Sequence, residues 1–160
     1  MLHLRASSLA DTHAIAAELA SVACAGDLIV LGGEMGAGKT AFAQGFGAAL
    51  GVTEPITSPT FTLVHSYDTP GKATLHHADI YRLSTHHEVA DLALAELLDY
   101  DGIVLLEWGE VVAQSLGAHL LVHLDPDPDD EGARLITVSV TGRSCAARWD
   151  RIREATVRFA

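Results

Sequence analysis

The chain has 160 residues, of which 49% are hydrophobic and 19% charged, a composition typical of a globular domain with its own core. Its 10 basic and 21 acidic side chains give a formal net charge of −11, which disfavours strong direct binding to nucleic acid or to an anionic membrane. No stretch has the length of a signal peptide's apolar region or of a membrane span. Cys24 and Cys145 are too few for a disulfide framework, so we expect two buried thiols in a cytoplasmic protein. We expect residues 1–160 to form a single domain.

The predicted elements alternate between helices and strands. Ser8 and Asp11 resemble a capping box, and the helix that follows runs through Val22 and is expected to end at Gly26. The later elements are, in chain order, a buried strand at 28–31, a helix at 40–50, a β-rich segment at 56–66 interrupted by Pro59, an extended segment at 75–81, a helix at 86–98, strands at 103–106, 120–124 and 135–140, and a helix at 146–159. This order predicts an α/β fold of the P-loop NTPase type: a mostly parallel sheet flanked by helices on both faces, with an antiparallel edge.

One short segment carries the strongest chemical signal. Residues 33–40, GEMGAGKT, match G-x-x-x-x-G-K-[ST] in full, between a predicted buried strand and a predicted helix. In such a loop the backbone N–H groups turn toward phosphate oxygens, and a Cβ would obstruct that approach. Lys39 can reach the β- and γ-phosphates, and Thr40 can offer its hydroxyl to Mg²⁺. The sequence therefore predicts a binding site for a nucleotide with Mg²⁺.

A phosphate loop needs a further carboxylate for its metal ion. Glu107 follows four apolar residues, so we expect it at the carboxyl end of a buried strand, where open α/β sheets bind their ligands. Direct and water-mediated coordination by Glu107 both stay open. Asp79 is the second candidate. Trp108, beside Glu107, is either a core residue or part of the site.

Other polar clusters predict no metal site. His76 and His77 are adjacent on a predicted strand, so their side chains point to opposite faces. The acidic run at 125–130 lacks the glycine and glutamate of a calcium-binding loop, and we interpret it as a solvated turn.

The choice of nucleotide follows from an absent residue type. The chain contains no asparagine, so the N-K-x-D pattern by which small GTPases select guanine is missing, and we expect ATP or ADP. Three kinds of phosphate-loop protein stay open at this point: an ATP hydrolase, a small-molecule kinase, and a nucleotide-binding switch that does not hydrolyse its ligand.

Five segments in one order make the resemblance specific. They are GGEMGAGKT, SPTFTLVHSY, HADIYRL, HEVADLALAELL and IVLLEW, and together they resemble the TsaE (YjeE) family over residues 8–140. Members of this family are bacterial ATPases needed to make threonylcarbamoyladenosine in tRNA. The chain departs from the family at Ala78, where phenylalanine is usual, and at Ala93, where glycine is common.

The resemblance implies a set of site residues. Lys39, Asp79, Glu107 and Thr60 would be catalytic, with Thr60 in a switch-like loop at 58–60, and Thr40, Asp79 and Glu107 would bind the metal. The residues expected to contact the nucleotide are Gly33, Glu34, Met35, Gly36, Ala37, Gly38, Lys39, Thr40, Ala41, Trp108 and Arg134. The resemblance also implies action on a complex of the TsaD and TsaB proteins, with a TsaC-type enzyme supplying threonylcarbamoyl-adenylate. The acidic chain suits this role, because the partners would carry the tRNA.

Overall fold

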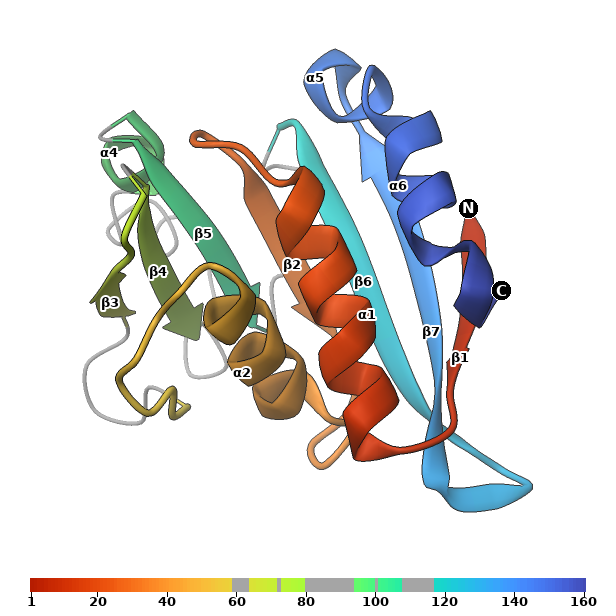
Figure 1. The fold of residues 1–160 in the computed structure, drawn as a ribbon. Coiled ribbons are helices and arrows are strands. Elements are labelled where there is room, and N and C mark those ends of the chain that lie inside the picture. Colours follow the sequence, from red (N-terminus) through yellow and green to blue (C-terminus); the bar gives the residue numbers. More distant parts are fainter. Residues whose placement is uncertain (59–63, 72, 80–93, 100, 108–116) are drawn as a thin grey trace.

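The computed structural model describes residues 1–58, 64–71, 73–79, 94–99, 101–107 and 117–160, which form a seven-stranded sheet flanked by helices (Figure 1). The strands are β1 (Leu2–Ala6), β2 (Leu28–Gly32), β3 (Val64–Asp68), β4 (Thr74–Asp79), β5 (Gly102–Glu107), β6 (His119–Asp127) and β7 (Asp130–Thr141). The helices are α1 (Leu9–Val22), α2 (Lys39–Ala49), α4 (Leu94–Asp99), α5 (Arg143–Ala146), α6 (Trp149–Thr156) and the short 3-10 helix η2 (Val157–Phe159).

The order of strands across the sheet is β1-β7-β6-β2-β5-β4-β3. The central pairings are parallel: β2 pairs with β5 and β6, and β5 pairs with β4. The outer pairings are antiparallel, with β3 against β4 at one edge and the β6–β7–β1 meander at the other. The predicted α/β sheet with parallel strands and an antiparallel edge is therefore confirmed, and the sheet is mixed rather than mostly parallel because antiparallel pairings reach both edges.

The described residues form two apolar clusters, one on each face of the sheet. In Figure 1, α1, α2 and α6 lie in front of the sheet. The larger cluster combines apolar residues of these helices with alternate strand residues such as Ile29, Leu31 and Leu105. The other face carries Val30 and its strand neighbours, against which Leu97 and Leu98 of α4 pack. Because β2 lies between the two clusters, all five of its residues are buried, as its continuous apolar sequence predicts.

The helix boundaries near the N-terminus differ slightly from the prediction. Ser8 caps α1 by accepting a hydrogen bond from the Asp11 N–H, but the Asp11 carboxylate accepts from the N–H of Ser7 rather than that of Ser8. The helix ends at Val22, and Gly26 lies beyond it in the turn before β2, with a φ of 91°. There its N–H donates to Gly102 O, which ties the turn to β5.

The two ends of the chain hold the largest differences. β1 was not predicted, although Leu2, Leu4 and Ala6 alternate with polar residues and turn toward the core. It pairs with β7, so it depends on a partner strand more than a hundred residues away. The predicted helix at 146–159 is instead the three short segments α5, α6 and η2.

The two cysteines differ in solvent exposure. Cys145 is buried, as expected, but Cys24 is exposed, so the prediction of two buried thiols is wrong for Cys24. Its position in the turn between α1 and β2 explains the exposure.

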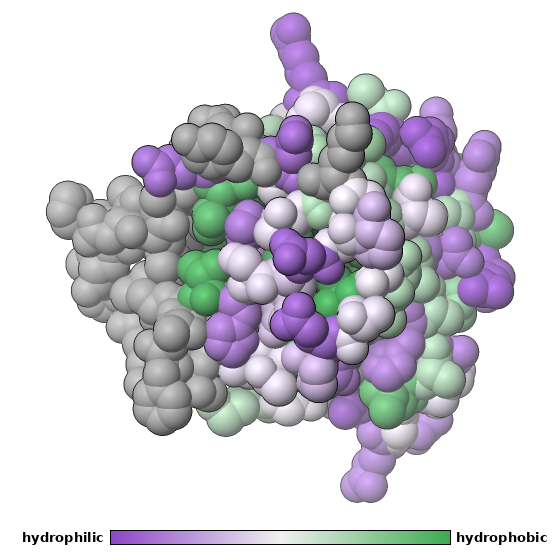
Figure 2. All heavy atoms as spheres, turned by 60° about the vertical axis from the view of Figure 1, so that its left-hand side comes forward, coloured by the Kyte–Doolittle hydropathy of each residue, from purple (hydrophilic) through white to green (hydrophobic). Residues whose placement is uncertain are grey.

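Figure 2 shows how hydropathy is distributed over the described residues on one face of the molecule. These residues are a mosaic of hydrophilic and near-neutral residues, with apolar residues visible only in small separate areas. None of the helices in the described residues has the length and apolar character needed to cross a membrane.

Candidate nucleotide site

The segment from Gly33 to Gly38 forms a loop between the end of β2 and the start of α2. Gly33 has a φ of 124°, and a Cβ placed there would lie 2.3 Å from the backbone oxygen of Leu124. Gly38 is the N-cap of α2 with a φ of 107°, and no side chain caps the helix there. A side chain at either position is therefore strained, and the backbone at the helix start stays bare. Such an arrangement is suited to binding phosphate, because the N–H groups at helix N-termini bind anions.

Lys39 is held inside this loop. The residue is 6% exposed, and its Nζ donates hydrogen bonds to the backbone oxygens of Gly33 and Glu34. Burying an ammonium group is costly unless it is hydrogen-bonded, and these carbonyls reduce that cost. The loop is also closed by a hydrogen bond from Ala37 N to Glu34 O. Lys39 therefore places a positive charge at the position that the loop motif requires.

The other loop residues fall into two groups. Glu34, Met35 and Gly36 form an exposed tip, whereas Ala37 is buried beneath it. Thr40 and Ala41 lie half-buried in the first turn of α2. The hydroxyl of Thr40 is thus on the first helical turn after the loop, where the motif expects a ligand for a metal ion.

The two candidate carboxylates come together through the parallel strand pairing. Glu107 ends β5, Asp79 ends β4, and the two residues are register partners. Glu107 is also the register partner of Leu31 in β2, two residues before the loop begins at Gly33. Carboxyl ends of parallel strands share one edge of the sheet, so both carboxylates lie at the edge where the phosphate loop starts.

Glu107 is buried and Asp79 is half-buried. A 2.9 Å hydrogen bond joins Oε2 of Glu107 to Nε2 of His77, whose side chain is 0% exposed. The prediction that His76 and His77 face opposite sides is confirmed by the sheet: His77 lies with Asp79 and Glu107, and His76 instead shares a 2.7 Å hydrogen bond with Ser66 Oγ. Sequence reasoning did not assign His77 to the site, although its spacing of two residues from Asp79 on a strand was the available signal.

Arg134 connects the β6–β7 hairpin with the phosphate loop. Its Nε donates a 3.0 Å hydrogen bond to Ala37 O, and its Nη1 donates to the backbone oxygens of Glu131 and Ala133. Arg134 therefore contacts the phosphate loop, and its expected contact with the nucleotide stays a prediction. Thr60 and Trp108 lie outside the described residues, as does most of the 58–60 loop.

The residues present fit a magnesium nucleotide. Glu107 is a buried carboxylate that accepts one hydrogen bond among the described residues, and Thr40 supplies a hydroxyl in the first turn of α2. Magnesium is commonly held by one or two carboxylates together with substrate phosphates rather than by a cage of protein ligands. In the described part of the chain, no three histidine, cysteine or acidic side chains cluster as a metal site of their own.

The acidic run at 125–130 is part of the β6–β7 hairpin. Arg5 donates hydrogen bonds to Asp127, at 2.8 Å, and to Asp130, at 3.3 Å. The pKa of Asp127 is lowered from its ordinary value first by a hydrogen bond from the Asp129 N–H and then by Arg5. The residues of this run are mostly exposed, as a solvated segment predicts, but residues 125–127 and Asp130 belong to β6 and β7, and only residues 128–129 form the turn.

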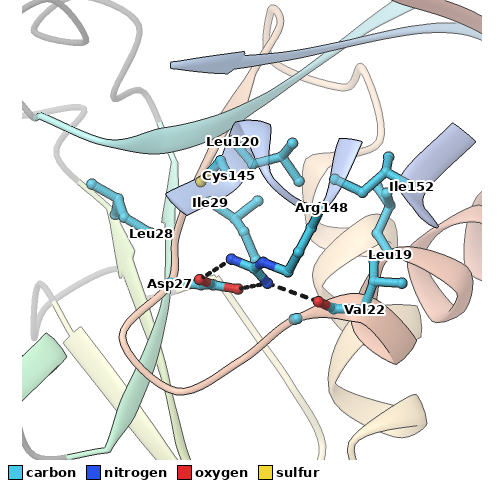
Figure 3. A pocket seen from close by; sticks show the side chains of 10 residues that line it. Leu19, Val22, Asp27, Leu28, Ile29, Leu120, Cys145, Arg148 and Ile152 are labelled. Atoms are coloured by element: carbon cyan, nitrogen blue, oxygen red, sulfur yellow. Dashed lines mark hydrogen bonds and ion pairs between the residues drawn. The ribbon is translucent and has the colours of Figure 1, made fainter. Parts of the chain in front are cut away.

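A cavity of about 20 Å³ lies at the opposite end of β2 (Figure 3). Arg148 reaches over it and forms a two-pronged ion pair with Asp27, at 2.6 and 2.7 Å, and also donates to Val22 O. Burial raises the pKa of the neighbouring Cys145 thiol, and the Asp27 carboxylate adds to that effect. The cavity has room for about one water molecule, so it is too small for a nucleotide. The hydrogen bonds of Arg148 to Asp27 and to Val22 O form a structural clamp that joins α1, the start of β2 and α6.

Comparisons with known proteins agree with this architecture. A family model described as "Threonylcarbamoyl adenosine biosynthesis protein TsaE" matches residues 6–136. A Mycobacterium tuberculosis protein named tRNA threonylcarbamoyladenosine biosynthesis protein TsaE is 42% identical over 123 residues, which cover 72% of this chain and 73% of the relative. A Bacillus subtilis protein of the same name is 38% identical over 133 residues, or 82% of this chain and 81% of the relative.

A solved structure extends the agreement to the fold. The crystal structure of Bacillus subtilis YdiB superposes with a TM-score of 0.73 at 30% identity, covering 98% of this chain and 94% of that one. The mixed sheet, its flanking helices and the loop after β2 define a protein with the P-loop fold. Within that class, the chain belongs to the TsaE family of tRNA threonylcarbamoyladenosine biosynthesis proteins.

Proposed function

We propose that this chain is a Mg²⁺-dependent ATPase that supports formation of threonylcarbamoyladenosine in tRNA by acting on a complex of TsaD and TsaB proteins. The observation that carries the proposal is the convergence of the phosphate loop, Glu107 and Asp79 at one edge of the sheet. Membership of the TsaE family supports the pathway, and the loop supports the nucleotide.

In this proposal each group has a separate task. The bare backbone of the loop binds the phosphates, and Lys39 shifts from loop carbonyls to phosphate oxygens. Thr40 and Glu107, with Asp79 beside it, hold the metal ion. When bound, Mg²⁺ neutralises charge on the β- and γ-phosphates. Thr60, in the 58–60 loop, and Trp108 keep the roles expected from the family resemblance, as a catalytic residue and as a nucleotide contact.

Fast hydrolysis also needs a group that stabilises the negative charge developing on the γ-phosphate in the transition state. Arg134 bonds to the phosphate loop, but its guanidinium is engaged by three backbone oxygens: those of Ala37, Glu131 and Ala133. Where an arginine finger is used, it contributes about 10³–10⁵ in rate. We therefore expect slow hydrolysis by the isolated chain and faster hydrolysis when TsaD and TsaB supply a group or order the 58–60 loop.

The test follows the fate of a radiolabelled γ-phosphate. The chain is incubated with labelled ATP and Mg²⁺, alone and with purified TsaB and TsaD proteins. Inorganic phosphate released faster in the presence of both partners supports the proposal. Label transferred to a small molecule would instead indicate a kinase, and tight ATP binding without release in either case would indicate a switch.

A further inference from the structure

One polar contact beside the candidate metal site has no role in the proposed function. The side chain of His77 is 0% exposed and that of Glu107 is 3% exposed, and the two are joined by the 2.9 Å hydrogen bond from Nε2 to Oε2. The bond crosses diagonally between neighbouring strands, because the register partner of His77 is Leu105 and that of Glu107 is Asp79.

The hydrogen-bonding environment of His77 selects one tautomer. Its Nδ1 is buried and has no hydrogen-bond partner among the described residues. A buried N–H without an acceptor is costly, so the ring carries its proton on Nε2 and leaves a lone pair at Nδ1. That proton is then donated to the Glu107 carboxylate.

Packing holds the ring in this orientation. Leu75 and Leu105 flank His77 as its strand neighbours on the same face, and both belong to the apolar cluster that contains Phe42 and Phe46 of α2. In a close-packed core, a ring of this size has little freedom to rotate. The donor at Nε2 is therefore fixed relative to the end of β5.

The consequence concerns the second carboxylate oxygen. Among the described residues, Glu107 accepts one side-chain hydrogen bond, at Oε2, so Oε1 is left for a ligand. A side chain with several rotatable bonds would otherwise lose conformational entropy when it binds a metal ion. Groups that orient a ligand's donor atoms in this way commonly affect metal affinity.

We propose that His77 is a positioning residue for Glu107, whose Nε2–H holds one carboxylate oxygen so that the other is presented to Mg²⁺ at the phosphate loop. The inference rests on the proposed function, because it assumes that Glu107 serves the metal ion. The competing role is structural: His77 would then only satisfy a buried carboxylate and would affect stability without affecting the metal.

Two substitutions separate these roles. In His77→Gln the amide nitrogen reaches the position of Nε2, so it can still donate a hydrogen bond to Glu107. In His77→Asn the amide nitrogen falls at the position of Nδ1, so the hydrogen bond to Glu107 is lost. His76→Asn is the matched control, since His76 is the neighbouring buried histidine of β4 but bonds to Ser66 on the other face.

The full chain is loaded with ADP, and Mg²⁺ affinity is measured by calorimetry, with Mn²⁺ as a paramagnetic probe of the metal's ligands. Thermal unfolding without ligand is measured in parallel. We expect His77→Asn to weaken metal binding about 10–100-fold, the range found when a group orienting a metal ligand is removed. His77→Gln and His76→Asn should stay close to the wild-type metal affinity and keep its Mn²⁺ spectrum.

The inference is overturned if His77→Asn lowers the melting temperature but binds Mg²⁺ as tightly as wild type. It is also overturned if His76→Asn weakens Mg²⁺ binding as much as His77→Asn does. If His77→Asn does not fold, His77→Gln decides: normal metal affinity supports the inference, and loss of affinity despite the retained donor contradicts it. If wild-type protein binds ADP with no linkage to Mg²⁺, the proposed function itself fails, which is a distinct result.

Discussion

Asp79 and Glu107 face each other on the last rung of the β4–β5 ladder. They are 28 positions apart in the chain (107 − 79), and parallel pairing brings them together because both residues end their strands. The same pairing logic places Glu107 opposite Leu31, just before the phosphate loop. Two carboxylates from different strands thus meet the loop without any local sequence motif that joins them.

The first prediction concerns the carboxylate and hydroxyl candidates. Thr40→Ala, Asp79→Asn and Glu107→Gln should each lower ATP hydrolysis far more than ATP binding, because the loop backbone still binds the phosphates. A decrease of about 10²–10³-fold in kcat is expected, as for removal of one preorganised group that stabilises a transition state. Phosphate release and calorimetric ATP binding measure the two effects. Hydrolysis at the wild-type rate in all three variants would refute the assignment of the metal site.

The second prediction uses two glycines of the loop. Gly36→Ala should destabilise the fold by about 1–2 kcal/mol, since a φ of 83° is unfavourable for a residue with a Cβ. Gly33→Ala should destabilise it more, because its Cβ would also lie 2.3 Å from the backbone oxygen of Leu124. Urea unfolding of both variants provides the comparison. Equal losses of stability would show that the close approach of β6 to the loop has no energetic effect.

Much of this arrangement was predictable from the sequence, and the reasons are local. The phosphate loop and the continuous apolar strand before it are short-range patterns, so they identified β2, α2 and Lys39 directly. Glu107 was found because its four preceding apolar residues mark the end of a buried strand.

Other features depend on contacts that no local pattern contains. β1 is stabilised by its pairing with β7, and the contact of Arg134 with Ala37 joins residues 97 positions apart. His77 was recognised as facing away from His76, but its hydrogen bond to Glu107 required the register between β4 and β5. Cys24 looked like a core residue by type, and its place in a turn decided its exposure.

The third prediction concerns the clamp in Figure 3. Arg148→Met leaves the partly buried Asp27 carboxylate and the Val22 carbonyl without this donor, and should lower the free energy of unfolding by about 1–3 kcal/mol. Arg153→Met is the control on the same helix, since its 3.6 Å pair with Asp150 is exposed and should contribute little. Chemical denaturation measures both. Matching stabilities for the two variants would contradict a stabilising role for the Arg148–Asp27 pair.

The fourth prediction is a pH dependence of stability. Burial lowers the pKa of His76 below its ordinary value. The unfolded chain therefore binds more protons than the folded one as the pH falls below about 6.5, the unperturbed histidine value. The contribution of His76 to stability is complete above that pH and is lost as the pH falls toward the folded pKa.

His76→Gln should therefore flatten the stability profile between about pH 7.5 and 5.5, where the unfolded histidine gains its proton. His3→Gln, at an exposed position of the edge strand β1, is the control and should leave the slope unchanged. Melting temperatures across this range report the slope. A His76→Gln profile as steep as that of wild type would contradict the assignment.

The central claim is that the loop from Gly33 to Thr40 binds an adenine nucleotide with Mg²⁺, and calorimetric titration with ATP and GTP tests it most directly. The titrations are run with and without Mg²⁺ on the wild-type chain and on Lys39→Ala, whose ammonium group is the buried charge of the loop. The account predicts one ATP site, strengthened by Mg²⁺, tighter than GTP binding and severely weakened in Lys39→Ala. Equal or tighter binding of GTP, or ATP binding that persists unchanged in Lys39→Ala, would contradict it.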